Sequence, residues 1–401
     1  MPTSPRRRLA TTAAALGLTT LTTLGVLAGA AAPAQAAPAD CPAGYFCAWK
    51  TDNATGEMFK TKADAPTLGS WDNKFRSVSN RTTKFACLHD DPNHGYDGDV
   101  WQIDPNPSGT EWGGAGSSTV SSLRLVATER ECTGLAAYPE WYAEKAPAAA
   151  GFGDLNADLT ADVLVRDKAG RLWFLPGDGT GKLVGAGGWN AMNTLTRHGD
   201  FTGDGKEDVI AREASTGKLW LYPGSGNGSL GARKLIGTGG WNAMTQLTAF
   251  GDLTGDKRSD VLAVEKSTGK LYLYPGTSSG ALGARKLLGS GGWNSMNALV
   301  GFGDMTKDGK ADLLAREAST GKLWLYPGAS SAVGPRTLIG GGWGGMASFL
   351  AVGDYSADGH HDLVALTRDG VETAYLGKPT TGFQPGAAAP YADWNGLNGA
   401  F

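Results

Sequence analysis

Cysteine is scarce in this sequence, and most of the chain has none. The four cysteines of the 401-residue chain all precede residue 133, at Cys41, Cys47, Cys87 and Cys132. No C-x-x-C pair is present, so disulfides explain these residues better than a zinc site does. Three pairings are possible, and the close spacing of Cys41 and Cys47 favours a bond between them and a second from Cys87 to Cys132. We predict a small N-terminal domain held by two disulfides in an exported protein.

An excess of positive charge is also missing. The chain has 36 basic and 39 acidic side chains, so its surface offers no electrostatic footprint for DNA or RNA. Catalytic motifs are absent as well, because the sequence has no G-x-S-x-G elbow, no H-E-x-x-H and no phosphate-binding loop. We therefore predict a protein that is not an enzyme and has no nucleic-acid partner.

The only long apolar run lies at the N-terminus. Arg6-Arg7-Arg8 precede an apolar stretch from Leu9 to Ala32, and a small-residue site follows at Ala34-Gln35-Ala36. This order predicts a signal peptide over residues 1–36, and it fits both the general secretory and the twin-arginine route. Cleavage before Ala37 would leave 33 basic against 39 acidic side chains. The mature chain is then predicted to be extracellular and to have no membrane span.

Glycine and tryptophan, by contrast, are abundant, at 61 and 13 residues. A Gly-Asp pair recurs at separations of 46, 52, 52 and 50 residues, and its aspartates are Asp154, Asp200, Asp252, Asp304 and Asp354. Each repeat holds four strand-length segments bounded by Gly and Pro, which is typical of a propeller blade. We predict an all-β chain with a disulfide-stapled Greek-key domain at 37–134, a linker at 135–147 and a five-bladed β-propeller at 148–401.

Each Gly-Asp pair opens a loop with oxygen-bearing side chains at positions one, three, five and nine. Ca²⁺ takes about six to eight oxygen ligands, so these loops are predicted to hold Ca²⁺. Ordinary Asp and Asn turns without metal are the alternative. The first and third loops are weaker candidates, because Leu159 and Lys257 replace the glycine found at position six elsewhere. The predicted ligands are Asp154, Asn156, Asp158, Asp162, Asp200, Thr202, Asp204, Asp208, Asp252, Thr254, Asp256, Asp260, Asp304, Thr306, Asp308, Asp312, Asp354, Ser356, Asp358 and Asp362.

A tryptophan turn, Trp-Asn in all but one repeat, precedes these loops. An indole face can stack on a sugar while an amide binds its hydroxyls, so equivalent turns would form a multivalent glycan site. The alternative is that each Trp is a structural plug between blades. The candidate glycan-binding residues are Trp189, Asn190, Trp241, Asn242, Trp293, Asn294, Trp343, Trp394 and Asn395. A second aromatic series is predicted to pack in the core and consists of Trp173, Trp220, Tyr272 and Trp324.

The Asp loops also carry a family resemblance. With Gly-Phe-Gly-Asp at 151–154 and 301–304, residues 148–377 resemble the FG-GAP or VCBS repeat family. That resemblance implies a propeller in which calcium has a structural role. The five repeats with Trp-Asn turns are also similar to five-bladed lectins of the tachylectin type.

The N-terminal domain divides into two similar halves, each opening with an aromatic-rich strand and closing with a serine-containing one. This pairing resembles the two Greek keys of βγ-crystallins. The opening Cys41-Pro42-Ala43-Gly44-Tyr45-Phe46-Cys47-Ala48-Trp49 further resembles the secreted bacterial metalloproteinase-inhibitor family of that fold. An inhibitory loop cannot be matched residue by residue.

These features together predict a secreted, non-catalytic binding protein whose propeller recognises a glycan or a cell-surface protein. One alternative is a secreted metalloproteinase inhibitor with the propeller as its targeting module. A second alternative is a lectin-like subunit of a secreted multiprotein assembly.

Overall fold

The computed structural model describes residues 41–109, 113–114, 119–146 and 153–401. The predicted signal peptide lies outside these residues. The chain divides into two compact units, Met1–Ala137 and Tyr138–Phe401, and the described parts of both are almost entirely β-structure. No helix in the described ranges is long and apolar enough to cross a membrane.

The first unit consists of two antiparallel sheets with strand orders β2-β1-β3-β6 and β5-β4-β7. Strand β6 comes from the second half of the unit and completes the sheet of the first half. Buried side chains such as Phe46, Phe75 and Leu88 form one core for the unit. The strands are β1 Phe46–Trp49, β2 Met58–Thr61, β3 Ser77–Asn80, β4 Phe85–His89, β5 Val100–Ile103, β6 Gly113–Gly114 and β7 Ser122–Val126, with short 3-10 turns η2 Gly69–Trp71 and η3 Pro92–His94.

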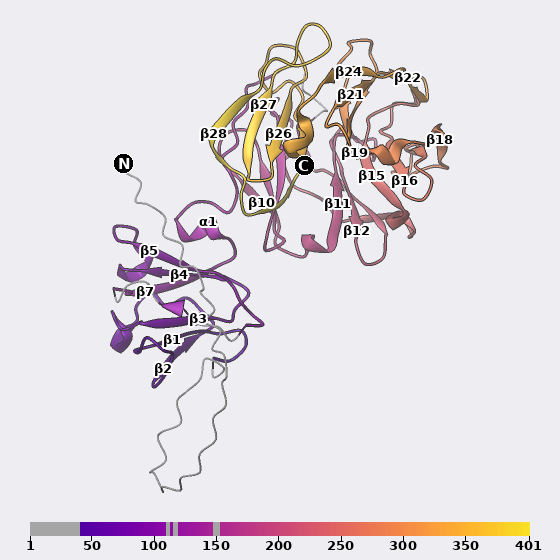
Figure 1. Ribbon diagram of the computed structural model, residues 1–401. Coiled ribbons are helices and arrows are strands. Elements are labelled where there is room, and N and C mark those ends of the chain that lie inside the picture. Colours follow the sequence, from indigo (N-terminus) through magenta and orange to yellow (C-terminus); the bar gives the residue numbers. More distant parts are fainter. Residues whose placement is uncertain (1–40, 110–112, 115–118, 147–152) are drawn as a thin grey trace, which may run out of the picture. The chain divides into compact units, whose positions relative to one another are not determined.

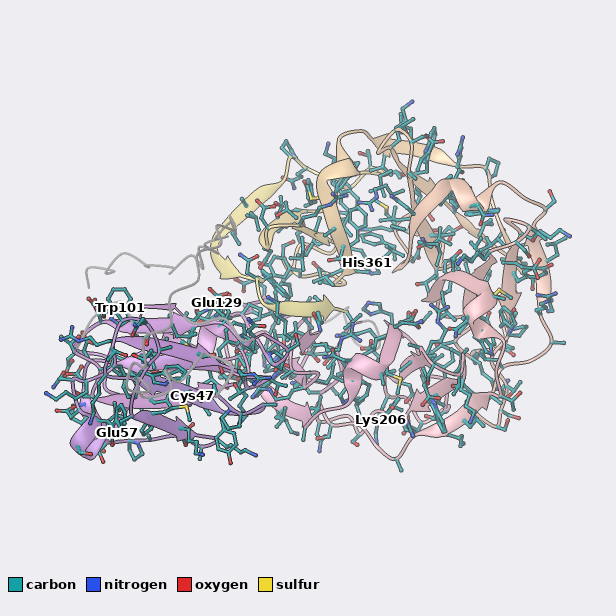
Figure 2. All side chains as sticks on the ribbon, turned by 60° about the horizontal axis from the view of Figure 1, so that its bottom comes forward. Cys47, Glu57, Trp101, Glu129, Lys206 and His361 are labelled. Atoms are coloured by element: carbon teal, nitrogen blue, oxygen red, sulfur yellow. A yellow bond between two sulfur atoms is a disulfide. The ribbon has the colours of Figure 1, made fainter. Side chains whose placement is uncertain are left out.

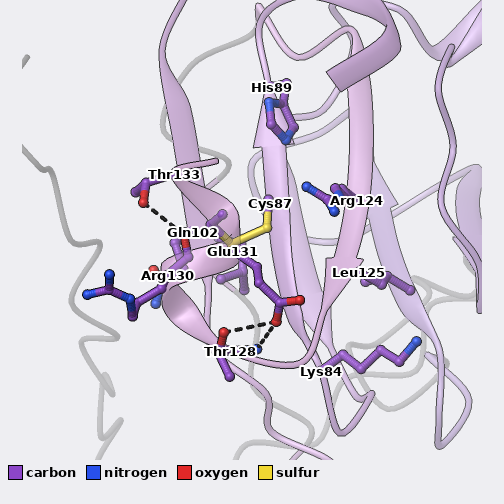
Figure 3. Close-up of a disulfide and its surroundings, with 12 residues drawn as sticks. Lys84, Cys87, His89, Gln102, Arg124, Leu125, Thr128, Arg130, Glu131 and Thr133 are labelled. Carbon is purple, nitrogen blue, oxygen red and sulfur yellow. Dashed lines mark hydrogen bonds between the residues drawn. A yellow bond between two sulfur atoms is a disulfide. The ribbon is translucent and has the colours of Figure 1, made fainter. Parts of the chain in front are cut away.

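Two disulfides hold this unit, in the pairing that the cysteine spacing favours. They are Cys41–Cys47 and Cys87–Cys132, with Cα atoms 5.9 and 5.2 Å apart, and Cys47 is marked in Figure 2. The second bond ties β4 to the short helix α1, Glu129–Cys132. Figure 3 shows that the Glu131 carboxylate accepts hydrogen bonds from the backbone N–H and the hydroxyl of Thr128, both at 2.9 Å. This capping box fixes the start of α1 beside the disulfide.

The described residues of the second unit form five four-stranded antiparallel sheets, set about a common centre (Figure 1). Short 3-10 turns lead into the inner strands of sheets two to five: η4 Trp189–Ala191, η5 Trp241–Ala243, η6 Trp293–Ser295 and η7 Trp343–Gly345. The first sheet comprises β8 Val163–Asp167, β9 Leu172–Leu175, β10 Lys182–Gly185 and β29 Leu397–Ala400. The second comprises β11 Met192–Thr196, β12 Val209–Glu213, β13 Leu219–Tyr222 and β14 Lys234–Gly237, and the third β15 Met244–Ala249, β16 Val261–Glu265, β17 Leu271–Tyr274 and β18 Lys286–Gly289. The fourth comprises β19 Met296–Gly303, β20 Asp312–Glu317, β21 Leu323–Tyr326 and β24 Thr337–Gly340, with a small hairpin of β22 Gly328–Ala329 and β23 Ala332–Val333, and the fifth comprises β25 Met346–Ala351, β26 Leu363–Thr367, β27 Val371–Tyr375 and β28 Ala387–Asp393.

Apolar cores fill the spaces between successive sheets. The middle strands are apolar on both faces because each sheet has two neighbours, so Val209 and Ile210 of β12 enter different cores. One core joins Val163 of the first sheet to Val364 of the fifth. Strand β29, from the C-terminal end, pairs with β8 and completes the first sheet. The ring is therefore closed both by a shared core and by a strand from the far end of the chain.

Residues 138–146 belong to this ring, although the sequence placed them in a linker over 135–147. Trp141 is 1% exposed and lies in the core between the fifth and first sheets. The backbone N–H of Ala143 donates to the carbonyl of Gly177 at 3.0 Å. The propeller unit thus begins before its first Asp loop.

Candidate binding sites on the propeller repeats

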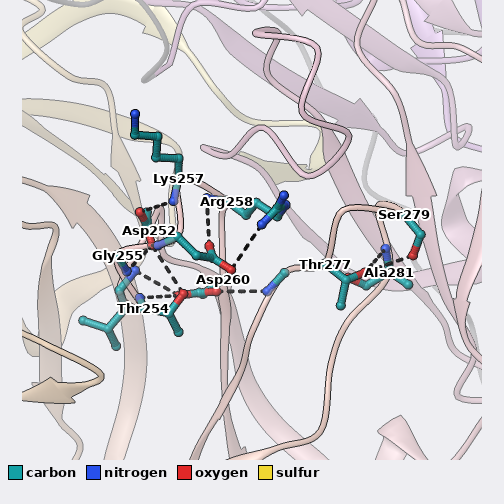
Figure 4. Close-up of polar contacts among 12 residues, drawn as sticks. Asp252, Thr254, Gly255, Lys257, Arg258, Asp260, Thr277, Ser279 and Ala281 are labelled. Atoms are coloured by element: carbon teal, nitrogen blue, oxygen red, sulfur yellow. Dashed lines mark hydrogen bonds and ion pairs between the residues drawn. The ribbon is translucent and has the colours of Figure 1, made fainter.

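The five Asp loops share one hydrogen-bonded form. In every loop the carboxylate at position one accepts hydrogen bonds from the backbone N–H groups of positions five and six. In the third loop, Asp260 at position nine accepts three more, from positions two and three and from Gly276 beyond the next hairpin, at 2.9 to 3.0 Å. Figure 4 shows Asp252 and Asp260 at the centre of this network. The two carboxylates therefore fasten the loop to the strands around it.

The loops without glycine at position six adopt the same backbone conformation as the others. Leu159 and Lys257 have φ values of 71° and 64°, close to the 79° of Gly205 at the same position. A left-handed residue with a side chain is uncommon and costs free energy, so the surrounding hydrogen bonds must hold it there. Sequence alone marked these two loops as weaker, but their folded form is unchanged.

The ninth aspartate is buried in every loop, and burial raises its pKa. The largest effects are at Asp162, whose pKa is raised to about 8, and at Asp208, whose pKa is raised to about 6. The Oδ2 atom of Asp162 accepts a hydrogen bond from the N–H of Leu155 at 2.6 Å, while its Oδ1 atom is buried without a partner. The first loop therefore holds a buried carboxylate oxygen that no hydrogen bond satisfies.

The loops meet part of what Ca²⁺ requires. Their donors are all oxygen atoms, which suits this ion. Among the described residues, however, no group of three or more His, Cys, Asp or Glu side chains is placed to hold a metal. In three loops the carboxylate at position five is 41 to 42% exposed and lies 3.5 to 3.8 Å from the lysine or arginine side chain at position seven. These carboxylates belong to Asp204, Asp256 and Asp308. These carboxylates would have to turn inward to complete a calcium shell.

The tryptophans of the Trp-Asn turns lie between sheets, and four of the five are buried, so little of their indole faces is open to a sugar. Trp189, Trp293, Trp343 and Trp394 are 4 to 8% exposed, and Trp241 is half-buried. The first four turns place their indole against a tyrosine of the following sheet at ring-centroid distances of 4.5 to 4.8 Å, in the pairs Trp189–Tyr222, Trp241–Tyr274, Trp293–Tyr326 and Trp343–Tyr375. This packing is what the alternative interpretation, a plug between sheets, expects.

The asparagine side chains of these turns are exposed, but they are engaged within the chain. The Nδ2 groups of Asn190, Asn242 and Asn294 donate to backbone carbonyls of the neighbouring hairpin at 2.8 to 3.0 Å. In the last turn the Trp394 indole N–H donates to the carboxylate of Glu372 at 2.8 Å. The turns therefore serve the ring's own structure.

A different surface emerges on sheets two, three and four. On each, an arginine guanidinium lies 4.0 to 4.1 Å from the centroid of an aromatic ring on the third strand, and a leucine on the fourth strand pairs in register with that aromatic residue. The leucines are 42 to 53% exposed. We call these groups the stacked patches, and they are Trp220–Arg233–Leu235, Tyr272–Arg285–Leu287 and Trp324–Arg336–Leu338. These aromatic residues were predicted to pack in the core, but each of them is only half-buried and is partly exposed at the surface.

A buried ion pair that the repeat pattern does not predict lies in the second repeat. The Nε atom of Arg197 lies 2.9 Å from Oε1 of Glu207. Burial opposes ionisation of Glu207, but the charge of Arg197 outweighs it, and the pKa of Glu207 is lowered to about 2. Comparison of the five repeats position by position would have found both residues as departures from the pattern.

Three comparisons place the chain among known proteins. Residues 34–103 match peptidase inhibitor family I36, and residues 200–263, 252–315 and 304–365 each match an FG-GAP-like repeat. No curated protein matches the chain.

Solved structures show low similarity. An Agrocybe aegerita lectin that recognises non-reducing terminal N-acetylglucosamine is 16% identical, with a TM-score of 0.37, 60% of this chain covered and 65% of the lectin. The Dos1 propeller is 9% identical, with a TM-score of 0.30 and coverage of 55% and 65%. The Photorhabdus luminescens Tc holotoxin pore is 16% identical, with a TM-score of 0.33 and coverage of 79% and 14%. The chain thus spans less than two thirds of the length of each of these chains. By its sequence matches, the chain joins a segment of peptidase inhibitor family I36 to a set of FG-GAP-like repeats.

Proposed function

We propose that the protein is a secreted, non-catalytic binding protein whose propeller recognises an extracellular protein through the stacked patches. The observation that carries this proposal is a leucine, 42 to 53% exposed, at the same position on sheets one to four, with an arginine stacked on the neighbouring aromatic ring on sheets two to four. Each of these leucines lies beside an aromatic ring and so forms a small apolar patch rather than a lone side chain, and exposed apolar patches mark interaction sites. Arginine and tryptophan beside an apolar contact are also the residue types that dominate protein-binding energies.

A glycan ligand fits this surface less well. Sugar stacking needs a free aromatic face, and in each stacked patch the guanidinium lies over the ring. The stacked arginine instead presents a fixed fork of N–H donors that suits a carboxylate on a partner protein. Arg285 already makes such a contact with Glu265 at 3.1 Å within the chain.

The test compares full-length protein with the variant Leu235→Ser/Leu287→Ser/Leu338→Ser on panels of purified extracellular proteins and of glycans. Val371→Ser is the matched control, because Val371 is 40% exposed on the fifth sheet, which has no stacked patch. The proposal expects protein binding that the triple variant loses and the control keeps. Binding confined to glycans, with equal strength in all three proteins, would contradict it.

We also propose that the Asp loops bind Ca²⁺ as a structural ion, since all their donors are oxygen atoms and the position-five carboxylates are partly exposed, with only long surface contacts to a neighbouring lysine or arginine to give up. In this role the ion would hold together carboxylates that otherwise repel one another. Bound calcium would stabilise the ring without taking part in recognition.

A second candidate function is peptidase inhibition by the first unit, which the match of residues 34–103 to peptidase inhibitor family I36 favours. The rigid two-disulfide frame of this unit is suited to holding an inhibitory loop in one conformation. Full-length protein should be titrated against a panel of secreted metallopeptidases and serine peptidases. Absence of inhibition at micromolar protein would remove this candidate and leave the propeller proposal untouched.

A further inference from the structure

The first repeat lacks a turn that later repeats possess. Six positions separate Pro176 from Lys182 in the first repeat, whereas eleven separate Pro223 from Lys234 in the second. The longer turn folds back on the glycine that follows the third strand, through the bridges Gly224↔Leu230, Gly276↔Leu282 and Gly377↔Phe383. The apolar residue of each bridge packs against an inter-sheet core. The short first turn, Asp178-Gly179-Thr180-Gly181, has no apolar residue to do this.

Residues 138–146 pair with the short turn of the first repeat and with its Asp loop. Tyr142 forms an antiparallel bridge with Asp178, and Lys145 forms one with Thr160. The carbonyl of Trp141 accepts a hydrogen bond from the N–H of Gly179 at 2.8 Å. The segment thus lies against the first repeat as an added strand.

The side chain that this segment buries is Trp141. Its indole N–H donates to the carbonyl of Ala161 at 2.6 Å, and its ring centroid lies 5.2 Å from that of Tyr355 and 6.2 Å from that of Trp394. These partners come from the first loop, the fifth loop and the last turn. We call this set of contacts around Trp141, formed by Ala161, Tyr355 and Trp394, the socket. It lies where the first and last parts of the propeller chain meet, and we call that junction the seam of the ring.

Contacts continue on both sides of the tryptophan. Tyr138 lies 5.1 Å from Trp173, ring centroid to ring centroid. On the other side the N–H of Glu144 donates to the carbonyl of Tyr355 at 3.1 Å, and that of Ala146 donates to Leu159 at 2.8 Å. Main-chain hydrogen bonds in both directions around one buried aromatic anchor are how extended peptides bind to folded domains.

We propose that this socket is a peptide-binding site whose occupant is the chain's own residues 138–146. Its ligand is an extended peptide with a tryptophan anchor and small residues on the C-terminal side, such as Ala143 and Ala146. The segment is held by its own contacts rather than by chain continuity, so it stays bound when the chain is cut between it and the first Asp loop. The second to fifth repeats have no need of such a peptide, since their own turns fill the equivalent place.

The test uses the full chain with a specific protease site inserted within residues 147–152 and cleaved after purification. The two fragments should co-elute in size-exclusion chromatography at low micromolar concentration. Trp141→Ala should weaken their association roughly 100-fold and separate them. Tyr142→Ala is the matched control and should leave them together, because Tyr142 is 58% exposed.

A second measurement avoids dependence on the folding of the Trp141 variant. A labelled peptide of residues 136–147 should exchange into the cleaved wild-type protein, and the same peptide with Trp141→Ala should not. Separation of the cleaved wild-type fragments, or co-elution of the cleaved Trp141→Ala fragments, would overturn the proposal. An uncleaved dimer that Trp141→Ala dissociates would also overturn it, by assigning the socket to a second copy.

Discussion

Arg197 and Glu207 form an ion pair of 2.9 Å in which their side chains are only 1% and 0% exposed. The third repeat carries Ala249 and Ser259 at these two positions. The second nitrogen of the guanidinium, Nη1, donates to the carbonyl of Asp162 at 2.9 Å. One buried arginine therefore ties the second repeat to the Asp loop of the first, next to the seam of the ring.

Removing one partner of this pair should destabilise the ring strongly. Arg197→Ala leaves the Glu207 carboxylate buried with only His198 beside it, and the loss of one partner costs about 3 to 5 kcal/mol in comparable buried pairs. The double variant Arg197→Ala/Glu207→Ser restores the residues of the third repeat and should recover part of that loss. Denaturant unfolding of the three proteins measures both effects. Additive losses in the double variant would show that the two side chains are not coupled.

Glu372 should make the ring less stable as the pH rises. It occupies the core position that Leu219, Leu271 and Leu323 hold in other sheets, and it is 3% exposed. Burial raises its pKa, and the hydrogen bond from Trp394 opposes this only in part. Its folded pKa therefore exceeds the unfolded value of 4.5, so its contribution is favourable below that pH and is lost as pH rises through the folded pKa.

Glu372→Leu should accordingly stabilise the protein at pH 7, by about 1 kcal/mol, and should remove this part of the pH dependence. Trp394→Phe is the companion variant, since it takes away the N–H donor and leaves the carboxylate in place. Thermal unfolding from pH 4 to pH 8 gives the comparison. Parallel pH profiles for Glu372→Leu and the wild type would contradict the assignment.

The repeat organisation and the disulfide pairing could be predicted because short motifs and the spacing between nearby residues indicate them. Gly-Asp pairs at intervals near fifty residues determine the sheets, and neighbouring cysteines favour one pairing. The role of Trp141 could not be predicted in this way. Its partners lie 20 residues or more along the chain, at Ala161 and Tyr355, and the only hint was the separation of 46 rather than 52 in the first repeat.

The Trp-Asn turns show a second limit. A tryptophan followed by an asparagine is compatible both with a sugar-binding surface and with a buried residue packed between sheets, because both use the same residue types. What decides between them is burial, which depends on the tyrosine that the next sheet presents 30 or more residues later. The stacked patches were missed for the opposite reason, since the alternation of β13, β17 and β21 resembles that of core strands.

Replacing an inter-sheet tryptophan should therefore affect stability before it affects any ligand. Trp293→Ala empties the core between the third and fourth sheets and should cost about 3 to 5 kcal/mol. Gly289→Ala should also destabilise, because its new Cβ would collide with the indole of Trp293. Asn294→Ala removes one hydrogen bond and should cost only about 1 kcal/mol. Wild-type stability in Trp293→Ala, together with loss of glycan binding, would restore the platform interpretation.

Calcium should separate the two kinds of aspartate in the Asp loops. At a concentration 100 times its Kd, a single bound ion would raise the free energy of unfolding by about 2.7 kcal/mol, and a chelator would reverse the gain. Asp256→Asn should reduce this gain and change little without calcium, because its contact with Arg258 at 3.5 Å is at the surface. Asp260→Asn should destabilise with and without the ion, since it loses charge that three backbone N–H groups face. Calorimetric titration measures calcium binding, and thermal unfolding in calcium and in chelator measures the stability of the wild type and of each variant. Equal stability of the wild type in both solutions would mean that the backbone hydrogen bonds alone hold the loops.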